Sequence, residues 1–215
     1  MKLSLDVYGT HVIEKIISYF DYELIKPISN FILDNFLFLA NNANGLCIVK
    51  KEIALEYQNE NFDRLKKELY NNALVLIQNP YGNYALQMCI NIWNLEDIKE
   101  IITTFYGKCS VLSIQKYSSN IIERCLEKSE EFLEHFVTEI CTNEGTIGLL
   151  MKNNYGNYVI QTALKVSKSN HQKMIINSIE KNLIHLNNKK LINKWKSIIS
   201  AYSVYLTECE KEIGI

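Results

Sequence analysis

Residues 79–87 have the sequence NPYGNYALQ, and residues 153–161 have the closely similar sequence NNYGNYVIQ. Three further segments, which begin at residues 6, 42 and 115, align with these two without gaps. The fourth residue of each segment, in chain order, is Gly9, Gly45, Gly82, Ser118 and Gly156. Steps of 36 to 38 residues separate these positions. A fixed period of this length is the signature of a repeat protein.

Each aligned segment has the pattern of a helix start. Four of the five begin with Asp or Asn, which are good N-terminal caps. The third, fourth and eighth residues after the glycine position are apolar almost throughout, as in Val12, Ile13 and Ile17. This spacing makes one apolar helical stripe. Apolar stretches just upstream, such as residues 36–39 and 74–77, indicate a preceding helix that packs on the first.

Helical units of this length stack and bury a continuous core, so the sequence predicts an all-α solenoid. No stretch shows sustained period-two alternation. We divide this single domain into a partial repeat at 1–21, repeats at 22–57, 58–95, 96–131 and 132–170, and a C-terminal cap at 171–215. The first repeat begins almost at Met1, so we expect it to lack a preceding helix.

Composition narrows the function classes. The formal net charge is −1, whereas proteins that grip duplex DNA through phosphates are usually strongly basic. No charge-free apolar run is long enough to span a bilayer. The six cysteines form no CxxC pair, and the four histidines show no metal-ligand spacing. We therefore expect no metal, no cofactor, no enzymatic activity and no membrane partner, in a protein of the cytoplasm.

The polar positions of each segment lie off the apolar stripe, at the first, second and fifth residues after the glycine position. We call these residues the triplet, and the helix that contains them the triplet helix. In chain order the triplets are Thr10-His11-Glu14, Leu46-Cys47-Lys50, Asn83-Tyr84-Gln87, Ser119-Asn120-Glu123 and Asn157-Tyr158-Gln161. A constant apolar frame with a varying polar triplet is typical of repeats that each recognise one RNA base.

The triplet chemistry suits single-stranded RNA. Two carboxamides one turn apart can pair with the edge of uracil, and the Glu123 carboxylate can accept two hydrogen bonds from guanine. Tyr84 and Tyr158 can stack on bases, which contributes roughly 1–3 kcal/mol per base. His11 and Asn120 occupy the same stacking position. The alternatives are a solvated polar face for the amides, packing for the tyrosines, a solvated or packed side chain for His11, and a capping or bridging role for Asn120.

Residues 79–87, 116–123 and 154–161 resemble the sixth, seventh and eighth repeats of the Pumilio (PUF) family. The resemblance covers about residues 1–200 and implies a right-handed α-solenoid that runs antiparallel to its RNA. The order Asn-Tyr-Gln, Ser-Asn-Glu, Asn-Tyr-Gln is the family's pattern for a UGU element. It implies the following contacts: Asn157 and Gln161 with U1, Ser119 and Glu123 with G2, and Asn83 and Gln87 with U3. A family domain has eight repeats, so this chain is expected to be the C-terminal part, about five of the eight.

Two triplets depart from that pattern. Leu46-Cys47-Lys50 lacks the polar pair of an adenine-reading repeat, although Lys50 could donate to a base or to a phosphate. Thr10-His11-Glu14 could recognise guanine through Glu14, or accept any base. The basic residues beside the triplets are candidates for phosphate contacts, with solvated side chains as the alternative: Lys15, Lys51 and Arg124.

The expected function is sequence-specific binding of a UGU element in messenger RNA 3′ untranslated regions. By resemblance, it would repress translation or promote mRNA decay together with decay or repressor proteins. One alternative is a protein-binding solenoid of the armadillo or HEAT kind. The other is a PUF-like ribosome-biogenesis factor that grips RNA with little sequence preference. The repeated Asn-Tyr-Gln triplets favour the first reading over both alternatives.

Overall fold

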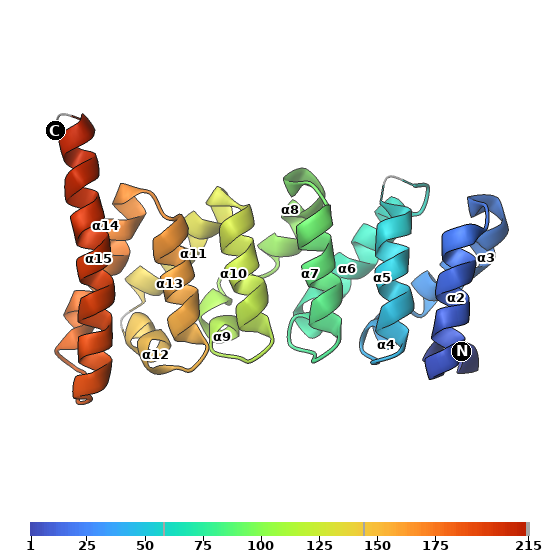
Figure 1. Cartoon of the computed structure of the whole chain (residues 1–215), viewed down its shortest axis with the longest axis horizontal. Helices are drawn as coiled ribbons and strands as arrows, with labels where there is room; N and C mark the ends of the chain where they lie inside the picture. The colour runs from blue at the N-terminus through green and yellow to red at the C-terminus, as the bar shows by residue number, and fades with distance from the viewer. Residues whose placement is uncertain (58, 144, 214–215) are drawn as a thin grey trace. The chain divides into compact units, whose positions relative to one another are not determined.

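The computed structural model (Figure 1) describes residues 1–57, 59–143 and 145–213, with side chains through Tyr202. Within these ranges the chain forms fifteen helices and no strand, which confirms the predicted all-α class. The helices group into two compact units, Met1–Phe105 and Tyr106–Ile215. The last two residues of the predicted cap, 214 and 215, lie outside the described residues.

The first unit contains three triplet helices. Its elements are α1 (Lys2–Leu5), α2 (Val7–Tyr19), α3 (Tyr22–Asp34), α4 (Phe36–Ala40), α5 (Gly45–Glu56), α6 (Phe62–Leu76), α7 (Gly82–Ile92) and α8 (Leu95–Thr103). Within this unit, α2 packs against α5 and α5 against α7, so the three triplet helices lie side by side (Figure 1). The helices α3, α4 and α6 pack behind them, which leaves the triplets on the other side.

The second unit contains two triplet helices and the cap. Its elements are α9 (Cys109–Ser113), α10 (Ser118–Lys128), α11 (Glu130–Thr142), α12 (Thr146–Lys152), α13 (Gly156–Val166), α14 (Ser169–Leu183) and α15 (Lys189–Ile213). The triplet helix α10 packs against α13, and α15 packs against α14. The fully buried Trp195 of α15 donates from Nε1 to the carbonyl of Met151, 3.2 Å away, which fixes α15 in its place.

The helices that precede the triplet helices differ from the prediction in one repeat. Residues 36–39 belong to the separate short helix α4, as expected, because Asn35 leaves the helical conformation and ends α3. Residues 74–76, in contrast, are the last turn of the longer helix α6, which begins at Phe62 and contains several charged residues in its first half. No Gly or Pro interrupts α6. Both helices pack on their triplet helix, as predicted.

Two expectations about the first repeat are wrong. It does have a preceding helix, the four-residue α1, which packs on α2. The predicted stripe residue Val12 is also 51% exposed, whereas Ile48 at the same position of α5 is fully buried. The reason is that Ile48 lies on a helix packed between α2 and α7, while the only triplet helix that packs on α2 among the described residues is α5.

A leucine six residues before each glycine position explains the glycines. In α5, a Cβ added at Gly45 would lie 2.6 Å from the carbonyl oxygen of Leu39, which real Cβ atoms do not tolerate. An added Cβ at Gly9 would meet the carbonyl oxygen of Leu3 in the same way, and one at Gly156 would lie 2.9 Å from the side chain of Leu150 and 3.1 Å from its Cα. These glycines are therefore close-packing positions at the start of their helices. Ser118 instead donates from its hydroxyl to the equivalent carbonyl, that of Leu112, at 2.6 Å.

Gly45→Ala is expected to destabilise the first unit by roughly 1–3 kcal/mol, because the new methyl group meets backbone atoms that cannot move aside. Chemical denaturation measures the change. The matched control is Gly148→Ala in α12, where the added Cβ would meet only the side chain of Asn182. Equal effects of the two substitutions would contradict the packing role of Gly45.

Asp6 is the N-cap of α2, as predicted, whereas Asn42, Asn79 and Asn153 lie three residues before the first residue of α5, α7 and α13. The side-chain oxygen of Asp6 accepts a hydrogen bond from the backbone N–H of Gly9 at 2.7 Å. Asn42, Asn79 and Asn153 make the same bond to the glycine of their own segment, at 2.9 to 3.0 Å. These bonds satisfy N–H groups that a helix start leaves without partners.

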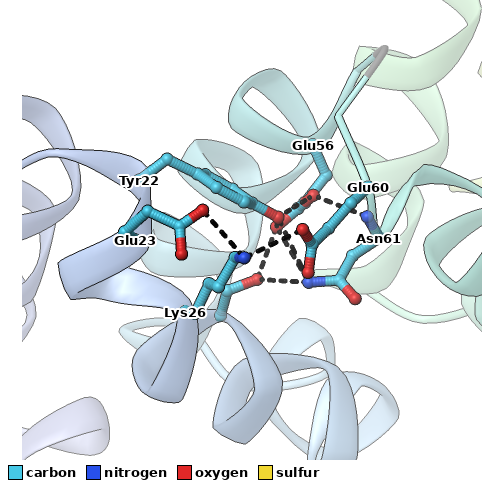
Figure 2. Close-up of polar contacts among 7 residues, drawn as sticks. Tyr22, Glu23, Lys26, Glu56, Glu60 and Asn61 are labelled. Atoms are coloured by element: carbon cyan, nitrogen blue, oxygen red, sulfur yellow. Dashed lines mark hydrogen bonds and ion pairs between the residues drawn. The ribbon is translucent and has the colours of Figure 1, made fainter.

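A buried acidic pair joins α3 to α5 in the first unit. Glu52 and Glu56 lie one turn apart on α5, and both are fully buried. The hydroxyl of Ser29 on α3 donates to Glu52 and, at 2.5 Å, to Glu56. The hydroxyl of Tyr22 donates to both oxygens of Glu56 at 2.9 Å, and Asn61 lies beside them (Figure 2). The second carboxyl oxygen of Glu52, Oε2, has no hydrogen-bond partner among the described residues.

Lys26 lies beside this cluster, 5.7 Å from the centre of the Tyr22 ring. Lys26 binds Glu23 at 2.8 Å and Glu60 at 3.0 Å, so its charge is already matched by exposed carboxylates (Figure 2). Burial, and then the neighbouring Glu56 carboxylate, raise the pKa of Glu52 from 4.5 to about 7. The native first unit therefore holds a proton on Glu52 at mildly acidic pH.

The division into repeats remains a prediction. Its boundaries after residues 95, 131 and 170 fall within the first two residues of α8, α11 and α14. A shift of one or two residues toward the N-terminus would place each boundary in a connection.

Candidate nucleic-acid interface

The three positions of a triplet differ in burial. The first position is buried in every triplet helix, as in Asn83 and Asn157. The second is exposed in four of the five triplets, with Tyr84 at 50% and Tyr158 at 58%. The fifth is partly exposed in four. The triplet helices α2, α7, α10 and α13 therefore each present an exposed ring or polar group beside a half-buried polar side chain.

The Asn-Tyr-Gln triplet has the same internal hydrogen bond in both helices that contain it. In α7, Gln87 donates from Nε2 to Asn83 Oδ1 at 2.9 Å, and Asn83 donates to the carbonyl of Asn79 at 2.8 Å. In α13, Gln161 makes the equivalent bond to Asn157 at 3.1 Å. The buried asparagine thus holds the glutamine, whose Oε1 can accept a hydrogen bond from a base edge. In α7 the second amide hydrogen of Gln87 can also be donated to a base, whereas in α13 Gln161 Nε2 also donates to the carbonyl of Asn157 at 3.0 Å.

The carboxylate of Glu123 is held from the neighbouring repeat. Thr162 of α13 donates from its hydroxyl to Glu123 Oε2 at 2.8 Å. Burial raises the pKa of Glu123, and the bond from Thr162 opposes that rise. The other carboxylate oxygen is left to accept from a ligand. Within the same triplet, Ser119 is buried and Asn120 is exposed, with its amide bonded to the carbonyl of Lys116 at 3.3 Å.

The first two triplets have different chemistry. In α2, His11 Nδ1 lies 3.1 Å from Glu14 Oε2, and the hydroxyl of Thr10 donates to the carbonyl of Val7. His11, at the stacking position, is therefore bound to Glu14, the residue that was expected to contact the edge of a base. In α5, Leu46 is buried and Lys50 is exposed, so the only charged group of this triplet faces solvent.

The candidate phosphate contacts are dispersed. Lys51 is exposed on α5. The ammonium of Lys15 lies 5.3 Å from the centre of the Tyr19 ring, within the range of a cation–π contact. Arg124 is half-buried on α10. No two of these three cations come from one helix. The predicted phosphate contacts therefore stay a prediction.

Two functional candidates were missed by the sequence analysis, Thr162 and Lys194. Lys194 of α15 donates from Nζ to Asn157 Oδ1 at 2.8 Å and lies 5.6 Å from the centre of the Tyr158 ring. Both residues contact a triplet on another helix. The triplet spacing relates positions within one helix only, so it gave no signal for either.

Neither a membrane-spanning helix nor a metal-binding cluster is found in the described part of the chain. Its helices include none with the length and hydropathy that a membrane crossing requires. Its His, Cys, Asp and Glu side chains form no group of three or more that could hold a metal ion.

The fold and the triplets define a class of helical repeat protein in which each triplet helix carries its triplet at the same positions. The model of the Pumilio-family RNA binding repeat matches residues 1–33, 72–103, 108–141 and 147–180, more than half of the chain. The chain belongs to this family. The matched segments leave out 34–71, which contain the divergent triplet of α5.

Relatives support the assignment. The chain is 31% identical over 196 residues to Pumilio homolog 12 of Arabidopsis thaliana, covering 91% of this chain and 33% of that protein. It is 32% identical over 174 residues to Pumilio homology domain family member 4 of Saccharomyces cerevisiae, covering 78% of this chain and 19% of that protein. The chain thus spans a third or less of the length of these two relatives.

Solved structures share the fold. The Puf4 RNA-binding domain bound to an HO endonuclease RNA 3′ UTR recognition sequence matches with a TM-score of 0.81 and 27% identity, over 94% of this chain and 64% of that one. PUF-8 in complex with PBE-RNA matches with a TM-score of 0.81 and 22% identity, over 94% and 60%. The predicted solenoid of Pumilio-type repeats is confirmed.

Proposed function

We propose that this chain binds single-stranded RNA with a UGU-type element, one base per triplet. The observation that carries the proposal is the repeated Gln–Asn hydrogen bond of α7 and α13, which holds a glutamine amide beside an exposed tyrosine in both helices. The Puf4 domain, which has the same fold, is bound to RNA in its structure. Membership of an RNA-binding repeat family points the same way.

The assignment of the three bases follows the resemblance to the Pumilio family, and the chemistry of the triplets fits it. In the second unit, Gln161 with Asn157 recognises U1 and stacks it on Tyr158, while Glu123 with Ser119 recognises G2. In the first unit, Gln87 with Asn83 recognises U3, which stacks on Tyr84. The RNA runs antiparallel to the chain. Lys50, Glu14 and the remaining residues of their triplets contact further bases of unassigned identity.

This binding involves no chemical step, so its biological effect depends on other proteins. We propose that the target elements lie in messenger RNA 3′ untranslated regions in the cytoplasm, and that mRNA-decay or translation-repressor proteins act on the bound message. The net charge of −1 supports recognition through bases rather than through phosphates alone.

The test is a titration of the chain with short RNAs that contain UGU or UCU, at one stated salt concentration. We expect the UGU RNA to bind roughly 10- to 100-fold more tightly, the effect of one well-formed bidentate base contact. Glu123→Ala should remove most of this preference, because the alanine cannot accept hydrogen bonds from guanine. Fluorescence anisotropy of labelled RNA measures both affinities.

The matched control is Glu127→Ala, which removes an exposed carboxylate from the same helix and should leave the preference intact. Equal binding of the two RNAs by the unmodified chain would favour a low-specificity RNA-binding relative. Failure to bind either RNA would favour a protein-binding solenoid. Either result would overturn the proposed function.

A further inference from the structure

The cap helix α15 brings a cation to the last triplet. Lys194 directly precedes the buried Trp195, whose bond to Met151 fixes the register of α15 within the second unit. The ammonium of Lys194 donates to Asn157 Oδ1 at 2.8 Å and lies over the ring of Tyr158, 5.6 Å from its centre. It therefore contacts the first two residues of the Asn157-Tyr158-Gln161 triplet at once.

The identical triplet of α7 is built without such a cation. There, Asn83 Oδ1 accepts from Gln87 Nε2, and no other donor to it is found among the described residues. In α13, Asn157 Oδ1 accepts from both Gln161 and Lys194. Two triplets with one sequence thus differ in one charged group, which comes from outside the repeat.

We propose that Lys194 is an additional base-binding residue, which makes the cap part of the site for the terminal base. This inference rests on the proposed function. An ammonium has three hydrogens, of which one is donated to Asn157. The remaining hydrogens can be donated to a ligand beside Tyr158, on which, under the proposed function, a uracil stacks. The carbonyl oxygens of uracil are the acceptors that these hydrogens fit.

The bond to Asn157 also gives Lys194 a positioning role. It holds the asparagine with its oxygen toward the ammonium and its Nδ2 toward the carbonyls of Asn153 and Asn154, at 2.8 and 3.0 Å. In that orientation Asn157 accepts the amide hydrogen of Gln161. The cation therefore supports the same glutamine that is proposed to pair with the terminal base.

The experiment combines protein and RNA substitutions in a cycle. The full chain and its Lys194→Met variant are titrated with UGU RNA, with RNA in which U1 is replaced by adenine, and with RNA in which U3 is replaced by adenine. Adenine has no carbonyl oxygen. We expect Lys194→Met to weaken binding of the UGU RNA about tenfold, the effect of a hydrogen bond to a charged donor. It should weaken binding of the U1-to-adenine RNA less than twofold.

Lys196→Met is the control, since Lys196 is an exposed lysine of the same helix. Thermal unfolding of each variant shows that the cap is intact. An equal loss of affinity for all RNAs, with a shallower salt dependence, would indicate a phosphate contact and overturn the base-binding role. If Lys194→Met caused no loss of affinity, both the base-binding and the positioning role would be overturned. The proposed function fails separately, if the unmodified chain shows no preference for G2.

Discussion

Glu52→Gln is expected to remove most of the pH dependence of the first unit's stability between about pH 4.5 and 7. The native pKa of Glu52 is raised from 4.5 to about 7. Within that interval the native state binds a proton that the unfolded state has lost, so the free energy of unfolding falls as pH rises. Above the native pKa of Glu52, this loss of unfolding free energy is complete. Its size is on the order of 3 kcal/mol, given about 1.4 kcal/mol per pKa unit.

The glutamine variant should equal or exceed the original chain in stability at pH 8 and differ little at pH 5. Its amide oxygen can still accept from Ser29, and its NH2 group can donate toward the neighbouring Glu56. Urea unfolding at both pH values measures the effect. The chain has two tryptophans, and Trp93 lies in the first unit, so fluorescence in a Trp195→Phe background follows this unit alone.

Glu60→Gln is the matched control for this prediction, because it removes an exposed carboxylate at the edge of the same cluster. Its unfolding free energy should keep the pH dependence of the original chain. If Glu52→Gln kept that dependence as well, the buried pair would not be its source.

Replacing Tyr84 and Tyr158 together by alanine is expected to weaken UGU RNA binding roughly 100-fold or more, since each ring contributes about 1–3 kcal/mol of stacking. Both rings are half-exposed, so their removal leaves the core of each unit intact. The single variants should each show part of the loss. Titration with the same labelled RNA measures all three variants.

Tyr70→Ala controls for loss of an exposed tyrosine elsewhere. Tyr70 is 48% exposed on α6, which packs behind the triplet helices. Its replacement should change RNA affinity less than twofold. A small effect of the double substitution, with folding intact by circular dichroism, would mean that these rings do not stack on bases.

The sequence was sufficient to predict the repeat architecture because its cause is local. A small residue is needed where the preceding leucine approaches the triplet helix: a glycine in four repeats, as at Gly45 beside Leu39, and Ser118 in the other. That requirement recurs once per repeat and appears as a period. The start of α6 at Phe62, well before residue 74, was not predicted, since it depends on the absence of a helix-ending residue rather than on a positive signal.

The candidate site was predictable only within single helices. The burial pattern within the triplets follows from helical geometry. Contacts between helices, such as Thr162 with Glu123 and Lys194 with Asn157, join residues 37 to 39 positions apart, and no spacing rule relates them. The same limit applies to Glu52 and Glu56, whose i, i+4 spacing is more typical of a solvated face than of a buried pair.

The asparagine–glutamine bond in α7 and α13 has a consequence for the thermodynamics of binding. A free glutamine side chain loses up to about 2 kcal/mol of rotamer entropy when it is ordered. Gln87 and Gln161 are already restrained in the ligand-free fold. Their ordering therefore belongs to folding and not to association. A base that arrives meets amide groups that are already held in place, so affinity at these two positions should depend little on the flexibility of the side chains that make the contact.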